Sequence, residues 1–404
     1  MAPFLTNRNP FHWSLATNAE TTSYQMSPRR LCSNPDFLHD PPDQAHHDIL
    51  GKCNHASCSN KCAQSDQGGD VTLDQPWQIP QPKVIYDISY FDNSQQNYLV
   101  SNFSYSKGLG NLMFQYASLK AIANSRNASL VVPLSNTLRR AFDLNATFVS
   151  DKVAEQLLKK TANATFETNA CCSFVKIPAP TGERISAVLG YMQNPLYFTP
   201  DSEPLVRKEF TFLEAVQKQA LNFMNSLSAR RALQRARPLW ITGKPGDEAF
   251  EMEPDALSDD LFYVGVHVRR GIDIEMNERN RKHGHVAAPA DYYKRAMALA
   301  KGDRENVVFV VCSDNIAWAK KNLPSYEKGT VFHCPGKYRE VDMAILAQCD
   351  ALVLSTGTFS WWTGFLNQKA SKIVYYADWP RPGSDLMKMV NKTEFFPSSW
   401  TPLS

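Results

Sequence analysis

The sequence predicts an α/β fold built on parallel sheets, for three reasons. In the second half of the chain, apolar runs of strand length alternate with segments of helical periodicity, which is typical of a parallel sheet covered on both faces. Loops rich in glycine, arginine or hydroxyl side chains follow several of these strands, where such sheets bind ligands. The 404 residues are 43% hydrophobic, which suffices for two medium-sized cores.

The N-terminal segment, residues 1–83, is polar and rich in Pro, Asn, Ser, Asp and His, so we expect a largely disordered stem without a core. Within it, Cys53, Cys58 and Cys62 cluster. A disulfide-pinned stem is favoured there over a zinc site because no His follows at ligand spacing. Nine cysteines in all, with Cys171 beside Cys172, suit an oxidising compartment.

Residues 84–237 are expected to form a first lobe. Its clearest elements are a strand at Tyr98–Phe103, a helix at Asn111–Asn124 and a strand at Leu130–Pro133, and the helix places Leu112, Tyr116, Leu119 and Ala123 on one stripe. A stretch from about 230 to 258, with many Pro, Gly and Asp residues, argues against a packed element. We place the linker between the lobes at 238–258.

Residues 259–404 are expected to form a second, Rossmann-like lobe. The expected strands are Phe262–Val268, Val307–Cys312, Thr330–His333, Ala351–Leu354 and Lys372–Tyr376, and the expected helices are Ala290–Ala300, Ile316–Asn322, Arg339–Gln348 and Phe359–Asn367.

Charge and hydropathy argue against nucleic acid as a partner and against a membrane span or signal peptide in this sequence. The net charge of +3 gives no basis for binding nucleic acid. No run approaches the roughly 18 apolar residues of a membrane span, and the first residues do not resemble a signal peptide. Five N-x-S/T sequons, at Asn102, Asn127, Asn145, Asn163 and Asn391, nevertheless suit a secretory protein. Either an anchor is missing from this chain, or it reaches its compartment by a route that the sequence does not show.

The first candidate binding motif is Lys107-Gly108-Leu109-Gly110-Asn111, between a strand and a helix. Glycines there let the backbone approach an anion at a helix start. A plain strand-to-helix turn capped by Asn111 explains the motif equally well.

The second motif, His267-Val268-Arg269-Arg270-Gly271, ends an apolar strand. Alternation along the strand puts His267 and Arg269 on one face, while Arg270 begins the loop. The planar fork of arginine is suited to a pyrophosphate. A surface charge pair fits this position poorly.

The third motif, Ser355 to Trp362, opens a helix after a strand, so its hydroxyl and amide groups form a second anion cradle. At least one indole of Trp361 and Trp362 belongs to the core, and the other is open to a role as a sugar-facing wall.

Asp342 lies in the first turn of its expected helix, where the helix dipole alone favours an acid. A carboxylate there can instead accept hydrogen bonds from a guanine edge or a ribose. No D-x-D stands at a strand end, and Asp273-Ile274-Glu275 follows the arginines too closely for a metal clamp. We therefore expect no metal site and no metal requirement.

Three segments, GLGNLMFQYASLKAIA, FYVGVHVRRG and DMAILAQCDALVLSTGTFSWW, resemble the galactoside 2-α-L-fucosyltransferases in order and spacing, over about residues 97–400. His-x-Arg-Arg is shared with α1,6- and protein O-fucosyltransferases, whereas Gly-Thr-Phe-Ser-Trp-Trp points to the α1,2 branch. The resemblance implies a GT-B-like fold of two Rossmann-like lobes with a cleft between them. It also implies GDP-L-fucose as donor, a galactose-terminated glycan as acceptor, inversion at the fucose anomeric carbon, and a Golgi type II membrane topology.

The resemblance also implies roles for particular residues. His267, Arg269 and Arg270 would hold the donor pyrophosphate with help from Thr358 and Ser360, and Asp342 would contact guanosine. Gly108, Gly110, Asn111 and Gln115 would shape the other wall of the cleft. The family pattern has an acid where this chain has Ile272, and Asp273 comes one residue later.

For the chemistry, Arg269 is expected to stabilise the leaving diphosphate, with Asp273 and Glu275 as candidate general bases. Two alternatives are an α1,6- or protein O-fucosyltransferase, and a catalytically silent glycan-binding protein.

Overall fold

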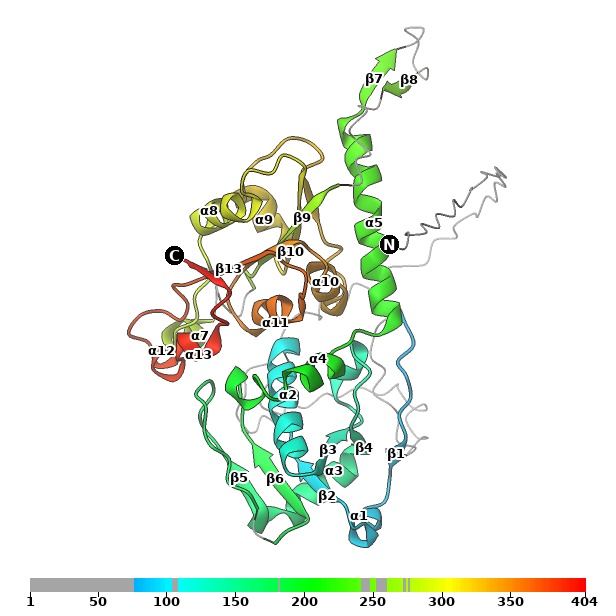
Figure 1. Cartoon of the computed structure of the whole chain (residues 1–404), viewed down its shortest axis with the longest axis vertical. Helices are drawn as coiled ribbons and strands as arrows, with labels where there is room; N and C mark the ends of the chain where they lie inside the picture. Colours follow the sequence, from blue (N-terminus) through cyan, green and yellow to red (C-terminus); the bar gives the residue numbers. More distant parts are fainter. Residues whose placement is uncertain are drawn as a thin grey trace, which may run out of the picture. The chain divides into compact units, whose positions relative to one another are not determined.

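A computed structural model describes residues 76–103, 108–180, 182–240, 248–251, 260–271, 274 and 277–404, with only the backbone for 237–240 and 248–251. The α/β prediction is confirmed, because the described residues form two six-stranded parallel sheets (Figure 1).

The first sheet has the strand order β1-β4-β3-β2-β6-β5. Its strands are β1 (Val84–Ile85), β2 (Asn97–Val100), β3 (Ala128–Pro133), β4 (Thr147–Val149), β5 (Thr165–Glu167) and β6 (Ile185–Leu189). The helices that accompany it are α1 (Ser89–Asn93), α2 (Leu109–Ser125), α3 (Asp151–Lys160), α4 (Glu203–Glu209) and α5 (Glu214–Arg235), with short 3-10 turns η1 (Thr137–Arg140), η2 (Ala162–Ala164) and η3 (Pro195–Tyr197).

The second sheet has the strand order β11-β10-β9-β12-β13-β14. Its strands are β9 (Phe262–Val268), β10 (Val307–Ser313), β11 (Val331–His333), β12 (Ala351–Leu354), β13 (Lys372–Tyr376) and β14 (Thr401–Leu403). Its helices are α7 (Glu278–His283), α8 (Ala290–Lys301), α9 (Ile316–Asn322), α10 (Arg339–Leu346), α11 (Thr358–Leu366), α12 (Asp385–Met389) and α13 (Lys392–Phe395). Counted along the chain this is the 3-2-1-4-5-6 order of a dinucleotide-binding sheet.

The expected linker contains more regular structure than its composition indicates. Helix α5 continues to Arg235, and β7 (Arg237–Trp240) pairs antiparallel with β8 (Glu248–Glu251). The buried side of helix α5 packs against α10, and near its end Gln234 Oε1 accepts a hydrogen bond from the Gly329 nitrogen at 3.0 Å. The local sequence shows neither partner. The division of the chain into lobes at 238–258 stays a prediction.

Helix α2 is buried on nearly every side and not along one stripe, because β3 lies on one side and α11 on another. The ring of Phe114 in α2 lies 4.6 Å from that of Trp361 and 5.0 Å from that of Trp362, between centroids. A single apolar core therefore continues from the first sheet to the second.

Residues 76–83, at the end of the expected stem, pack on the folded body. Trp77 is buried; its indole Nε1 donates to the Arg140 carbonyl at 2.9 Å, and its ring meets Tyr338 edge-on at 5.1 Å. Beside it, Arg140 Nε lies 3.1 Å from Glu340 Oε1, and the Glu340 side chain is fully buried. The rest of the expected stem, including the cluster at Cys53, lies outside the described residues.

The sequons and the disulfides both bear on cellular location. Four sequon asparagines are exposed and Asn102 is half-buried. Disulfides join Cys171 to Cys172 and Cys312 to Cys334. Within the described part of the chain, no helix is both long and apolar enough to cross a membrane.

Candidate functional site

The candidate site lies where strand order reverses in the second sheet. Strand β9 starts the sheet, the chain then moves outward through β10 to β11, and it returns to β12 on the other side of β9. Crossovers leave in opposite directions from neighbouring strands at such a point, so a crevice opens at their carboxyl ends. The two loops there are the arginine motif after β9 and the hydroxyl-rich motif after β12.

His267, near the end of β9, is buried and faces the opening of α11. Its Nδ1 lies 2.6 Å from Ser360 Oγ, and its ring lies 4.7 Å from that of Phe359. Burial, and secondly the charge of Arg269, lower its pKa to about 3. The imidazole is therefore neutral near pH 7, so it can contribute a hydrogen bond to a ligand but not a positive charge.

Arg269 and Arg270 do not act as a pair, because their side chains have different neighbours. A Cβ atom built on Gly357 would lie 2.2 Å from Arg269 Nη1, so that guanidinium sits directly against the start of α11. The Arg270 guanidinium stacks on Trp318 at 3.7 Å and donates to the Ala288 carbonyl at 2.5 Å. Arg269 is thus the better placed of the two to meet an anion at α11.

The starts of α2 and α11 converge on the same place. A Cβ on Gly110 would lie 2.6 Å from both the Phe359 nitrogen and the Thr358 carbonyl carbon, and Thr358 Oγ1 donates to Asn111 Oδ1 at 2.6 Å. Gly357, the N-cap of α11, has φ +88°, a value that favours glycine. Each helix start carries positive partial charge from the aligned peptide dipoles.

The remaining predicted residues of the first lobe divide between two positions. Gly108 is the N-cap of α2, so it lies at the junction just described. Gln115 lies deeper, is buried, and donates through Nε2 to the Gly190 carbonyl at 3.0 Å. That hydrogen bond ties α2 to the chain after β6.

Asp342 lies in the first turn of α10, as expected, and is 8% exposed. Its Oδ1 accepts a hydrogen bond from the Gly336 nitrogen at 3.3 Å. Burial, with a smaller contribution from Glu340, raises its pKa to about 6. A buried carboxylate with so few partners is costly unless a ligand supplies donors.

The disulfide Cys312–Cys334 lies beside Asp342. The two sulfur atoms and a carboxylate oxygen of Asp342 lie within 4.8 Å of one another, which is the spacing of a metal site. Thiolates are the metal ligands, and in this structure both sulfurs are joined to each other, so the residues do not fit a bound metal.

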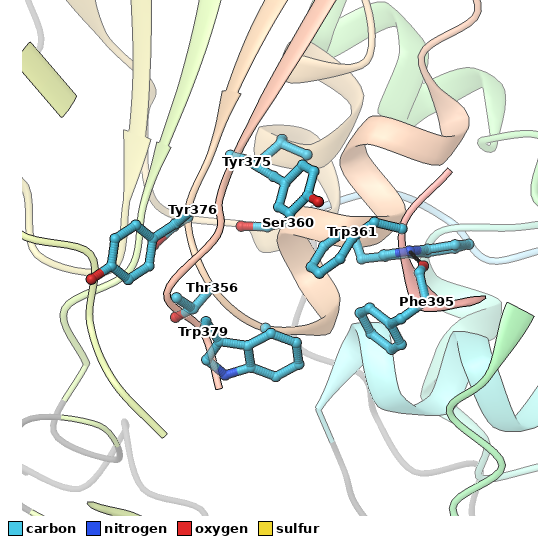
Figure 2. Close-up of a pocket in the computed structure, with 11 residues that line it drawn as sticks. Thr356, Ser360, Trp361, Tyr375, Tyr376, Trp379 and Phe395 are labelled. Atoms are coloured by element: carbon cyan, nitrogen blue, oxygen red, sulfur yellow. Dashed lines mark hydrogen bonds between the residues drawn. The ribbon is translucent and has the colours of Figure 1, made fainter. Parts of the chain in front are cut away.

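A small cavity adjoins the opening of α11 (Figure 2). Its water-accessible volume is about 10 Å³, which is room for about one water molecule. Thr356 Oγ1 and Trp379 Nε1, both buried, have no hydrogen-bond partner among the described residues, and both side chains line this cavity.

Both tryptophans of the third motif belong to the core. Trp361 is 1% and Trp362 0% exposed, so the expectation that one of them forms a sugar-facing wall is wrong. The cause is the packing of α11 against α2, which places both indoles against Phe114. Phe198 and Phe210, which cover Trp362, are distant in sequence.

Two of the predicted site residues are not described by the structure, and two residues that hold the arginine loop were not predicted. The candidate bases Asp273 and Glu275 lie outside the described residues. Trp318 and Tyr293, which hold the arginine loop, were missed, because both read as ordinary apolar positions of α9 and α8. Neither lies near the motif in the sequence, so no local signal connects them to it.

Comparisons with known proteins agree with the resemblance. Residues 250–403 match the model of glycosyl transferase family 11. The chain is 25% identical over 295 residues to galactoside alpha-(1,2)-fucosyltransferase 1 of Gorilla gorilla gorilla, covering 72% of this chain and 71% of that protein. It is 26% identical over 298 residues to galactoside 2-alpha-L-fucosyltransferase SEC1 of Bos taurus, covering 72% and 70%.

Solved structures show a more distant likeness. Fucosyltransferase NodZ from Bradyrhizobium aligns with a TM-score of 0.40 at 14% identity, over 69% of this chain and 95% of that one. POFUT1 in complex with GDP aligns with a TM-score of 0.40 at 11% identity, over 70% and 98%. Such values carry no argument about function. The family match and the relatives confirm the predicted resemblance and the prediction that the chain is a glycosyltransferase.

Proposed function

We propose that this chain is a galactoside α1,2-fucosyltransferase, which transfers L-fucose from GDP-L-fucose to the 2-hydroxyl of a terminal galactose with inversion. One observation carries the proposal: the starts of α2 and α11 and the Arg269 guanidinium meet at the switch point of a dinucleotide-type sheet. Three sources of positive potential at one place suit a diphosphate. The relatives, which are named as galactoside α1,2-fucosyltransferases, supply the linkage and the acceptor class.

The hard step is departure of GDP from the fucose anomeric carbon. Negative charge then accumulates on the diphosphate while the sugar becomes oxocarbenium-like, and the acceptor oxygen attacks from the opposite face. Arg269 and the positive ends of the two helices would lie beside that charge, so they would stabilise the transition state with little reorganisation. The neutral His267 can add a hydrogen bond.

Asp342 is assigned to the guanosine of the donor. Its carboxylate is buried and accepts a hydrogen bond from the Gly336 nitrogen, and guanine N–H groups or ribose hydroxyls would supply further donors. Binding of GDP should therefore favour the ionised carboxylate. The general base remains proposed as Asp273 or Glu275.

The reaction is proposed to need no metal ion. The helix starts and Arg269 supply positive charge at the place where a divalent cation would otherwise offset the diphosphate. The secretory location, with membrane association in the Golgi, is also a proposal. Its support is the pair of disulfides and the exposed sequons, which suit an oxidising, glycosylating compartment.

The test is an acceptor assay with GDP-L-fucose and lactose, N-acetyllactosamine or a core glycopeptide, followed by linkage analysis of the product. We expect α1,2-linked product from the galactosides. Product on the glycopeptide alone would favour an α1,6- or protein O-fucosyltransferase, and saturable glycan binding without GDP release would indicate a silent binding protein.

Arg269→Ala separates the proposed site from the general fold. It should lower turnover by about 10² to 10³, the usual effect of removing one charged transition-state contact. The matched control is Arg295→Ala, an exposed arginine of α8 paired with Asp291, which should retain turnover. Near-normal turnover of Arg269→Ala would refute the assignment.

A further inference from the structure

The hydroxyl of Ser355 joins three elements behind the candidate site. Ser355 Oγ accepts a hydrogen bond from the Arg269 nitrogen at 3.2 Å and another from the Tyr293 hydroxyl at 2.9 Å. Arg269 follows β9, Ser355 follows β12, and Tyr293 belongs to α8. One hydroxyl group therefore links both loops of the switch point to a helix that carries none of the binding motifs.

Tyr293 is suited to hold that junction permanently. Its side chain is fully buried, and burial raises the pKa of its phenol well above the usual range. The hydroxyl thus keeps its proton at any pH at which the protein would be assayed. It is a fixed donor to Ser355 and does not switch with pH.

The hydrogen bonds of Ser355 hold the main chain of Arg269, and the side chain of Arg269 is constrained as well. The main chain of Arg269 is held by Ser355, and its guanidinium lies against Gly357. Without the hydrogen bond to Ser355, the main chain of Arg269 could move and carry the guanidinium away from the start of α11. Arginine loses its advantage as a ligand for phosphate when its planar fork is not held in orientation.

We propose that Tyr293 is a positioning residue for the donor diphosphate: through Ser355 it fixes the backbone of Arg269 and so keeps the guanidinium at the start of α11. The proposal rests on the proposed function, because it takes the diphosphate as the ligand of Arg269. Tyr293 does not touch the ligand in this arrangement.

The neighbouring Tyr292 provides a matched control. It is also fully buried on α8, its ring lies 5.2 Å from that of Tyr293, and its hydroxyl donates to the Leu354 carbonyl at 2.7 Å. Both tyrosines thus hydrogen-bond to adjacent residues of the same strand end. Only the bond of Tyr293 reaches a group that also holds Arg269.

The experiment measures GDP affinity by calorimetry for the unaltered chain, Tyr293→Phe and Tyr292→Phe, together with the thermal midpoint of each. Both variants lose one buried hydrogen bond, so similar losses of Tm are expected. Only Tyr293→Phe should raise the Kd for GDP, by about two- to twelvefold, the size of one such bond.

Equal GDP affinity in the two variants would overturn the proposal, since Tyr293 would then serve stability alone. Should Tyr293→Phe fail to fold, Ser355→Ala removes the same junction from the other side and must raise the Kd for GDP as well. No GDP binding by the unaltered chain would overturn the proposed function, and this inference with it, a result distinct from equal affinities.

Discussion

Replacing Asp342 by Asn should stabilise the free protein at neutral pH while weakening its affinity for GDP. The carboxyl is buried, and its pKa is raised from 3.8 to about 6. A group whose pKa is higher in the folded protein stabilises the fold while it is protonated, and this stabilisation is lost as pH rises through the folded value. Asn, which does not ionise, should be free of this loss.

The size of the effect follows from the pKa values. At about 1.4 kcal/mol per pH unit, a rise from 3.8 to about 6 makes ionised Asp342 cost about 3 kcal/mol above pH 7. Below pH 4 the cost vanishes because the carboxyl is protonated in both states. For a folded part of this size, 3 kcal/mol corresponds to roughly 5 °C in Tm. The amide oxygen can still accept from Gly336, so that hydrogen bond is retained.

The assay is the difference in Tm between Asp342→Asn and the unaltered chain, measured from pH 4.5 to pH 8. His267, whose pKa is lowered to about 3, has the opposite effect: stability is lost as pH falls from 6.5 towards 3. That contribution is the same in both proteins and cancels in the difference. Asp303→Asn, at an exposed position, is the control and should leave Tm unchanged throughout.

GDP provides the second half of the test. A ligand that binds only the folded state raises Tm according to its affinity, so GDP should raise the Tm of the unaltered chain more than that of Asp342→Asn. A Tm difference that is flat with pH would refute the reasoning about burial. An equal rise with GDP in both proteins would refute the guanosine contact.

Three further predictions concern the rest of the site. Gly110→Ala places a methyl group 2.6 Å from backbone atoms of Thr358 and Phe359, so it should lower stability by about 1–3 kcal/mol and lower GDP affinity; unchanged Tm in a melting experiment would show that the contact yields freely. Cys334→Ser opens the bond to Cys312 across a separation of 22 residues and should cost about 3 kcal/mol; dithiothreitol should destabilise the unaltered chain similarly and the variant little further, and equal sensitivity of the two would contradict this. Transferase activity should be complete in EDTA, whereas restoration of a lost activity by Mn²⁺ would overturn the metal-independent mechanism.

Five of the six strands of the second sheet could be predicted to within one residue at each end, whereas the short edge strand β14 was not predicted. Strands β9, β12 and β13 begin and end where the sequence predicts, because each is a short apolar run bounded by polar or turn-forming residues. Helix α5 could not be followed to Arg235, since its end is held by the loop before β11, where the Gly329 nitrogen donates to Gln234 Oε1 and Arg235 Nε donates to the Lys328 carbonyl. Local composition carries no information about such a partner.

The candidate site shows the same limit. Strand ends and helix starts predicted the place, and His267, Arg269 and Thr358 are brought together there. The divergence of Arg270 depends on the ring of Trp318, and the burial of Gln115 depends on the Gly190 carbonyl. These partners are set by tertiary packing, so adjacent arginines in the sequence read as a pair although their side chains separate.

The position of Trp77 has a practical consequence for handling the protein. Its indole contacts the Arg140 carbonyl and the Tyr338 ring. The chain is therefore fixed at Trp77 to two separate parts of the fold, η1 and the start of α10. A pulling force applied through a tag or surface attachment ahead of residue 76 would act first on the contacts of Trp77. Such a force would separate Trp77 from η1 and from the start of α10 before it disrupted either sheet.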